Sequence, residues 1–271
     1  DGVLSFAVDP NNQANQEIVD LKLAPRDDTG RVVFRAGYTL LAPEDPQRGN
    51  RRLIVDVVNR GRRRAVDIFN RVSNPTEGSG DIPEGDGFLF HHGYAVVSIG
   101  WQWDVYGSKD LLALEAPQAQ IGGSPVRGQA VVEIRPNRVE HSWLLANRRH
   151  RPYPVAHPND PDARLLVREW EDGPDAELPR DQWRFARETA DGPIDSREHI
   201  YLKSGFQPGK IYNIIYTTDR APVVGGGLLA LREVATWLRN PSALNPVEGG
   251  FERVYGYGVS QTGRMLRHFV Y

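Results

Sequence analysis

Apolar side chains occur in short runs and in periodic patterns along this chain, and these predict its strands and helices. Residues 52–58 and 94–100 are nearly continuous apolar runs, which are typical of strands covered on both faces. We expect short helices at 62–69 and 88–92. Strand, helix and strand in succession indicate a parallel sheet with helices on its faces.

Residues 17–24 and 31–41 roughly alternate apolar and polar side chains, and the segment between them is rich in turn-forming residues. This pattern predicts two antiparallel strands joined by a turn.

The pattern changes between residues 105 and 210, where proline, glycine and charged residues become more frequent. Three further strands are expected there, at 126–134, 163–170 and 199–203. A strand at 210–216 and a helix at 228–239 then resume the earlier pattern. We therefore interpret 1–104 and 211–271 as one core and 105–210 as a β-rich insertion, a lid or specificity region; a separate domain is the alternative.

The end of the chain carries the strongest candidate chemistry. A short β-type run at 254–257 leads to Ser260, after which the apolar residues fall on one face of a helix. A serine at a sharp strand-to-helix turn is the geometry of a nucleophile elbow, in which the next backbone N–H can bind an oxyanion. The general motif has a glycine two residues after the serine, whereas Thr262 is found here. On these residues alone, an ordinary strand–turn–helix is an equal alternative.

A catalytic serine needs a base, usually histidine, that is oriented by a carboxylate. Only eleven residues follow Ser260, and none of them is acidic. His268 lies about two turns along the following helix, too far to reach back. The sequence thus offers a nucleophile without its usual partners.

Three aromatic or polar residues, Trp101, Gln102 and Trp103, follow the strand at 94–100 directly. In open α/β sheets, ligands bind at the carboxyl ends of the strands. These side chains would line a substrate pocket there, or they would close the core.

Composition narrows the classes of function. The chain has 271 residues, 39% hydrophobic content, a formal net charge of −2 and no cysteine. These values exclude a disulfide framework and thiolate metal sites, and they give no argument for nucleic acid or membrane binding. The sequence contains no apolar run of about 18 residues, so it predicts no transmembrane helix. The chain starts without methionine and stops within a predicted helix, so we expect a piece of a longer protein.

Other candidate sites are weaker. The glycines at 225–227 do not fit a nucleotide-binding motif, and we interpret them as a tight turn that lets a helix pack closely. His91 and His92 have no partner at a metal-binding spacing. The arginines at 60 and 62–64 would form a solvated helix start or contact an anion. We expect no metal and no cofactor.

Several segments together resemble the α/β-hydrolase superfamily and, more narrowly, an uncharacterised "alpha/beta hydrolase domain" family of bacterial proteins. The similar segments cover nearly the whole chain and are residues 18–26, 58–61, 87–94, 100–102, 178–183, 205–212 and 258–264. The family's version of the elbow reads Ser-Gln-Ser/Thr-Gly-Arg, which accounts for Thr262.

The resemblance implies a fold, an activity and a site. The fold would be α/β, an α/β-hydrolase-like mostly parallel sheet flanked by helices, incomplete at the C-terminus. Ser260 would be the nucleophile, Gln261 one oxyanion donor, and the Asn59–Arg60 loop the second. The acid and the histidine would lie beyond Tyr271. A periplasmic or secreted location is implied by the resemblance alone.

These observations predict a serine hydrolase that cleaves carboxylic esters through an acyl-enzyme on Ser260, with poor activity in the chain as given. The expected partner is a small-molecule ester, and the oligomeric state is not predicted. One alternative is a ligand-binding relative or inactive fragment without chemistry. The other is a peptidase or acyltransferase.

Overall fold

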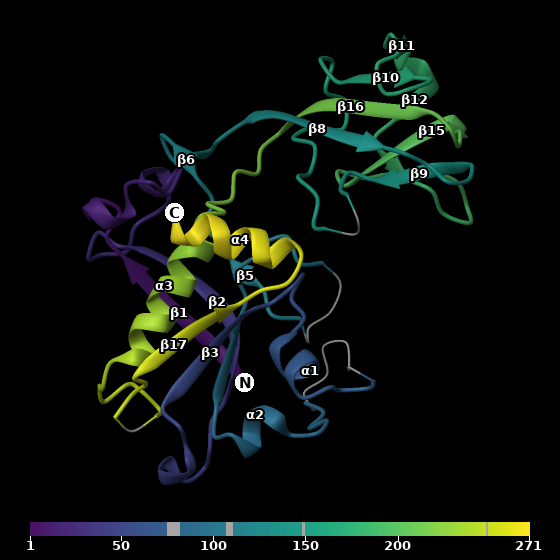
Figure 1. Cartoon of the computed structure of the whole chain (residues 1–271). Helices are drawn as coiled ribbons and strands as arrows, with labels where there is room; N and C mark the ends of the chain where they lie inside the picture. The colour runs from purple at the N-terminus through teal and green to yellow at the C-terminus, as the bar shows by residue number, and fades with distance from the viewer. Residues whose placement is uncertain (75–81, 107–110, 148–149, 248) are drawn as a thin grey trace. The chain divides into compact units, whose positions relative to one another are not determined.

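A computed structural model of the chain describes residues 1–74, 82–106, 111–147, 150–247 and 249–271 (Figure 1). The chain divides into two compact units. The first consists of Asp1–Pro117 together with Pro222–Tyr271, and the second is Gln118–Ala221.

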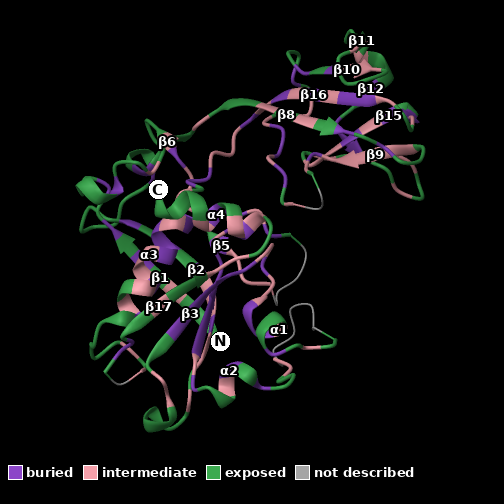
Figure 2. Ribbon diagram, viewed as in Figure 1, coloured by how far each residue is buried: buried purple, intermediate pink, exposed green. Residues whose placement is uncertain are grey.

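The first unit is built around one mixed sheet. Its strands, in spatial order, are β1 (Gly2–Val8), β2 (Val32–Leu41), β4 (Ala95–Ile99), β3 (Arg52–Val57) and β17 (Arg253–Tyr257), and β5 (Leu114–Glu115) also pairs with β2. The β1–β2 and β2–β4 pairs are antiparallel, whereas β4–β3 and β3–β17 are parallel. β3 is buried along nearly all of its length, as its apolar sequence predicts (Figure 2).

Helices lie on both faces of this sheet. On one face, α1 (Ala65–Phe69) and α2 (Phe88–His91) contribute Val66 and Leu89 to a buried cluster with side chains of β3 and β4. On the other face, α3 (Gly226–Arg239) contacts β2, where the Tyr38 ring meets that of Trp237 at a centroid distance of 6.3 Å. The expected helices are confirmed, because each has an apolar face to bury.

Gly227 explains the run of glycines at the start of α3. A Cβ at this position would lie 2.2 Å from the carbonyl oxygen of Trp101, in the loop after β4. Only glycine lets the helix approach so closely. The interpretation of these glycines as a packing feature fits this contact.

The N-terminal segment differs from the prediction. Residues 17–24 do not form a strand: they hold turns and the 3₁₀ helix η2 (Leu21–Leu23), next to another, η1 (Gln13–Asn15). The partner of β2 is β1 instead. Asp20 has a left-handed φ of 63°, which breaks any strand, and Val19 is 75% exposed.

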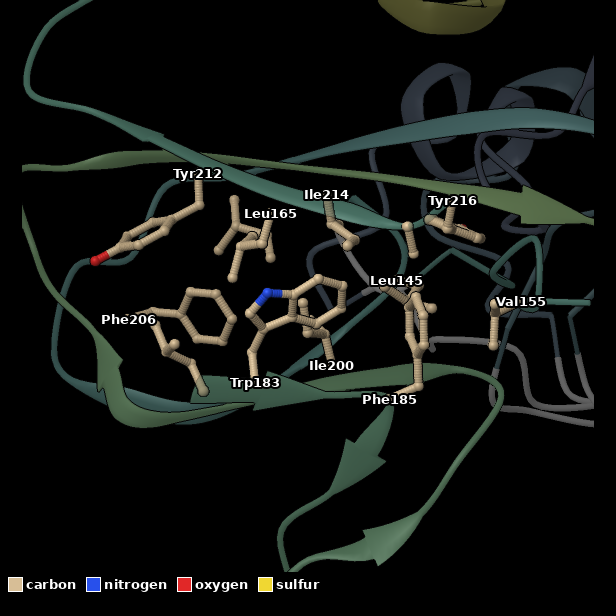
Figure 3. Packing of buried hydrophobic residues seen from close by; sticks show 13 residues of the cluster. Leu145, Val155, Leu165, Trp183, Phe185, Ile200, Phe206, Tyr212, Ile214 and Tyr216 are labelled. Carbon is tan, nitrogen blue, oxygen red and sulfur yellow. The ribbon is translucent and has the colours of Figure 1, made fainter. Parts of the chain in front are cut away.

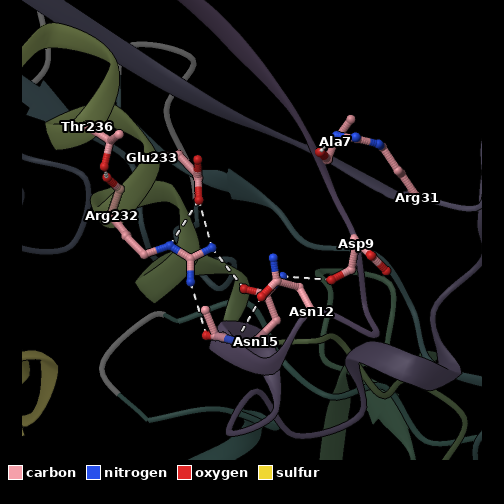
Figure 4. A network of polar contacts seen from close by, with 9 residues as sticks. Ala7, Asp9, Asn12, Asn15, Arg31, Arg232, Glu233 and Thr236 are labelled. Carbon is pink, nitrogen blue, oxygen red and sulfur yellow. Dashed lines mark hydrogen bonds and ion pairs between the residues drawn. The ribbon is translucent and has the colours of Figure 1, made fainter. Parts of the chain in front are cut away.

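Arg232 of α3 ties this segment down (Figure 4). Its guanidinium donates to the Ala14 carbonyl at 3.1 Å, to Asn15 Oδ1 at 2.8 Å and to Glu233. Asn15 in turn donates to the Asp9 carbonyl at 2.7 Å. These contacts hold the residues just before 17–24, the stretch whose alternation suggests a strand.

The second unit is antiparallel throughout its described sheets. A four-stranded sheet has the order β11 (Ala176–Leu178), β10 (Arg164–Arg168), β16 (Ile211–Thr218) and β8 (Gly128–Ile134). A three-stranded sheet consists of β12 (Trp183–Arg184), β15 (His199–Phe206) and β9 (Glu140–Leu144). Two small hairpins are formed by β6 (Gln120–Ile121) with β7 (Ser124–Pro125), and by β13 (Ala186–Arg187) with β14 (Ile194–Asp195).

Aromatic residues fill the core of this unit. Figure 3 shows Trp183 and Phe206 from one sheet facing Tyr212 and Tyr216 from the other. The Trp183 and Phe185 rings meet edge to face at 5.6 Å. Expected strands at 126–134, 163–170 and 199–203 correspond to β8, β10 and β15. The strand expected at 210–216 is β16, and it pairs within this unit and not within the core. The unit therefore spans Gln118–Ala221, whereas the sequence suggested 105–210.

The expected fold class, an α/β-hydrolase-like mostly parallel sheet flanked by helices, is wrong. The described residues form many short antiparallel strands in several sheets and only four α-helices. Helices precede both β4 and β17, and these two strands pair in parallel with β3, but most other successive strands of the described residues return through turns or loops. Such connections produce antiparallel pairs.

Candidate functional site

Ser260 lies between β17 and α4 (Gln261–Val270), where the change of hydrophobic period predicts a turn. Its φ is 58° and its ψ is −113°, a conformation that costs a residue with a Cβ roughly 1–3 kcal/mol. Ser260 is exposed, and its hydroxyl has no hydrogen bond to any residue that the structure describes. The hydroxyl is therefore open to an incoming molecule.

Thr262 holds this turn in place. Its buried hydroxyl accepts a hydrogen bond from the Val259 N–H at 2.9 Å and donates to the Val259 carbonyl at 3.1 Å. The Thr262 N–H also donates to that carbonyl at 3.2 Å. The departure from the general glycine motif thus has a structural role, because the hydroxyl satisfies backbone groups at the start of α4.

The loop after β3 contacts the same turn. Asn59 Nδ2 donates to the Val259 carbonyl at 3.0 Å. Asn59 and Arg62 exchange two backbone hydrogen bonds, and between them Arg60 and Gly61 have φ values of 51° and 82°. Positive φ at both central positions is characteristic of the mirror-image hairpin turn. The loop and the Ser260 turn are therefore in contact through Asn59.

The predicted oxyanion donors differ in their availability. The Gln261 N–H lies in the first turn of α4, where the helix itself provides no acceptor. By contrast, the Asn59 N–H donates to the Arg62 carbonyl, and the Arg60 N–H donates to Gln102 Oε1 at 3.1 Å. The role of Gln261 stays a prediction, and a role for Asn59 or Arg60 would require one of these bonds to break.

The residues expected to line a pocket have structural contacts. Trp101 is half-buried and donates from Nε1 to the Val58 carbonyl at 2.8 Å. Gln102 is buried and accepts from Arg60, while Trp103 is 8% exposed. Gln102 thus connects the loop after β4 to the loop after β3. Their role in binding a substrate stays a prediction.

Asp56 is a further candidate that the sequence analysis did not single out. It is fully buried in β3, opposite Ser98 of β4 and Tyr257 of β17. Oδ2 accepts from Ser98 Oγ and from the Arg64 N–H, both at 2.9 Å, and Oδ1 has no hydrogen-bond partner among the described residues. A lone carboxylate within an apolar strand was the signal in the sequence.

Burial raises the pKa of the Asp56 carboxyl from 3.8 to about 6, although the hydrogen bonds from Arg64 and Ser98 oppose this shift. Burial also raises the pKa of Tyr257, and the negative charge of Asp56 adds to it. Tyr257 lies in β17, three residues before Ser260, and Asp56 is its neighbour across the sheet in β3.

No histidine of the described residues hydrogen-bonds to Ser260. His268 is exposed on α4, and His91 and His92 lie in and after α2. The expectation that the base and its carboxylate lie beyond Tyr271 stays a prediction.

Comparisons with family models, with curated proteins and with solved structures each gave no match. The resemblance to a hydrolase family therefore stays a prediction, and the local geometry around Ser260 is the remaining evidence for a function.

Within the described ranges, no helix combines the length and the apolar character needed to cross a bilayer. In the same part of the chain, no three histidine or acidic side chains gather closely enough to hold a metal ion.

Proposed function

We propose that Ser260 is a nucleophile and that the protein hydrolyses carboxylic esters through an acyl-enzyme on this residue. The observation that carries the proposal is the backbone of Ser260, which holds an exposed hydroxyl in a strained conformation at the start of α4. Strained backbone is concentrated at functional sites, and no structural contact of the hydroxyl accounts for it here.

The reaction has two steps. Ser260 Oγ attacks the ester carbonyl, its proton passes to a base, and the alcohol leaves with a proton, so that the acyl group remains on Oγ. Water then releases the acid and restores the serine. We assign the Gln261 N–H to the developing oxyanion, because it lies next to Ser260 at the start of a helix.

The base is the component that the described residues do not provide. A free serine hydroxyl is a weak nucleophile, so we expect slow acylation and slow turnover of this chain by itself. We propose that the histidine and its carboxylate come from outside the described residues.

The test is intact-mass analysis of the full chain after incubation with 4-nitrophenyl acetate. We expect one acetyl group on Ser260, identified by peptide mapping, and its loss in Ser260→Ala. Ser242→Ala is the matched control, because Ser242 is an exposed serine of the same unit. Acetylation that is identical in both variants would refute a nucleophilic role for Ser260.

A second candidate function is ligand binding without chemistry. It is favoured by the Asn59 and Arg60 N–H groups, which are already hydrogen-bonded, and by the absence of a base beside Ser260 in the described residues. This candidate predicts no acyl adduct on Ser260 and a ligand whose affinity is the same in Ser260→Ala.

A further inference from the structure

A cavity of about 640 Å³ lies entirely within the second unit. Its walls include Arg180, Trp183, Arg184, Tyr201 and Lys203. The volume is in the range of small-molecule sites, roughly 300–1,000 Å³. The cavity has the size for a small organic ligand, and its polar groups indicate which kind.

Arg180 is the central cation of this cavity. It lies in the 3₁₀ helix η4 (Arg180–Gln182), half-buried, with its guanidinium 4.0 Å from the ring centroid of Trp183. Two of its nitrogens donate to the carbonyls of Trp183, at 2.6 Å, and Pro158, at 3.1 Å. These contacts fix the planar group in one orientation.

Arg180 forms no ion pair with any residue that the structure describes. Burial lowers the pKa of its guanidinium, and the negative charge of Asp160 only partly opposes this. A half-buried guanidinium without a carboxylate partner is costly, because carbonyl oxygens compensate the lost hydration incompletely. A bound anion would provide the missing charge.

The carboxylates that line the cavity do not fill this role. Asp160 is buried and accepts from the backbone N–H groups of Thr217, at 3.0 Å, and Asp162, at 3.1 Å. Asp181 is exposed, and among the described residues it is not paired with Arg180. Neither carboxylate therefore forms an ion pair with Arg180 among the described residues.

Two more cations line the cavity, and one of them is available. Arg184 donates to the Pro193 carbonyl at 2.6 Å and pairs with Asp195 at 3.7 Å. Lys203 is exposed and has no hydrogen bond or ion pair with the residues described. By contrast, Lys210 of the same unit pairs with Glu169 at 2.8 Å.

An aromatic wall completes the cavity. Tyr201 stacks on His141 with a centroid distance of 6.1 Å and an interplanar angle of 28°. This contact holds the Tyr201 ring in place at the cavity wall, where it can lie against the carbon body of a ligand.

We propose that this cavity binds a small organic carboxylate, with the carboxylate held by Arg180 and Lys203 and a ring-shaped body against Tyr201. Arginine suits this role because its planar fork matches the two oxygens of a carboxylate. The site is independent of the function proposed for Ser260.

The first experiment is isothermal titration calorimetry of the full chain with benzoate and with D-glucuronate. At least one should bind with a Kd of about 1 mM or tighter. The neutral analogues, benzamide and D-glucose, should bind at least about tenfold more weakly, because the charge provides the recognition. Absence of binding by both carboxylates at about 10 mM, or equal binding of the neutral analogues, overturns the proposal.

The second experiment uses variants with the carboxylate that binds. Lys203→Gln should weaken binding about threefold to tenfold, and Arg180→Gln by more than about tenfold. Lys210→Gln and Ser260→Ala should leave the Kd unchanged. Because Arg180 also bonds to backbone carbonyls, Arg180→Lys is included, and cooperative unfolding is checked for each variant. An unchanged Kd in Lys203→Gln, or in a folded Arg180 variant, contradicts the assignment.

Discussion

Asp56 is a single residue that leaves the apolar pattern of its strand recognisable and also makes contacts that this pattern does not predict. Apart from Arg52 at its start, its strand is otherwise apolar, and the sequence predicts the strand correctly without using the carboxylate. In the structure, Thr39, Ser98, Asp56 and Tyr257 lie in register across four strands. The carboxylate accepts the N–H at the start of α1, so it connects the sheet to that helix.

The raised pKa of Asp56 predicts how stability depends on pH. Because the pKa is about 6 in the folded state against an ordinary value of 3.8, the folded protein binds the proton more tightly than the unfolded chain. The contribution of Asp56 to the free energy of unfolding should therefore fall as pH rises from about 4 to 6, and then level off. Asp56→Asn removes this dependence. The difference in the free energy of unfolding between Asp56→Asn and the original protein should therefore shift in favour of the variant, by up to about 3 kcal/mol, as pH rises from about 4 to 6.

Urea unfolding at several pH values measures this difference. Asp27→Asn is the contrasting control: hydrogen bonds from the Arg31 and Thr29 backbone and from the Thr29 hydroxyl lower the pKa of Asp27, so its contribution is lost as pH falls. The free energy of unfolding that Asp27→Asn loses relative to the original protein should therefore be larger at neutral pH than in acid. If the curves for Asp56→Asn and the original protein remain parallel, the buried carboxylate does not titrate as described.

At the scale of elements, the sequence predicts secondary structure best where a hydrophobic pattern is compatible with only one type of element. The apolar runs that form β3 and β4 and the stripe that forms α3 are such cases. Residues 17–24 are a contrary case, because their alternating pattern is compatible with a strand that they do not form. Arg232, far along the chain, bonds to the residues just before them and holds those residues outside any strand. Partners so distant in sequence leave no local signal.

The start of α3 offers a test of close packing. Gly227→Ala should lower stability by about 1–3 kcal/mol, because the new Cβ would lie 2.2 Å from the Trp101 carbonyl oxygen. Gly226→Ala is the matched control, since its Cβ would lie 3.6 Å from the nearest atom, and it should be neutral or stabilise by up to about 1 kcal/mol. Urea midpoints give both values; a neutral Gly227→Ala would mean that the helix shifts freely.

At the scale of the whole molecule, two units have separate cores. The aromatic cluster around Trp183 is made only of residues between 118 and 221. Within the first unit, the loop after β3 contacts the turn before α4 through Asn59, and it contacts the loop after β4 through Gln102. The composition at 105–210 indicates a change of architecture, but not that β16 pairs with β8 and β10.

The separate core predicts that residues 118–221 fold alone. We expect the isolated segment to unfold cooperatively and to show dispersed amide resonances. Trp183→Ala should cost about 3–5 kcal/mol and unfold it, whereas Trp170→Ala, at a position 60% exposed, should have little effect. A disordered segment would mean that the unit depends on the rest of the chain.

The sequence by itself determined the main strands and helices with strong apolar patterns, the turn at Ser260, and the absence of any cysteine chemistry. It did so because local periodicity follows directly from which side chains can be buried. The tertiary structure alone decided the pairing of strands, and hence that the sheets are largely antiparallel. It also decided the burial of Asp56, the bonds that occupy the Asn59 and Arg60 N–H groups, and the lack of an ion pair between Arg180 and any described carboxylate. Each of these depends on groups far apart in the chain, whose distance only the folded protein fixes.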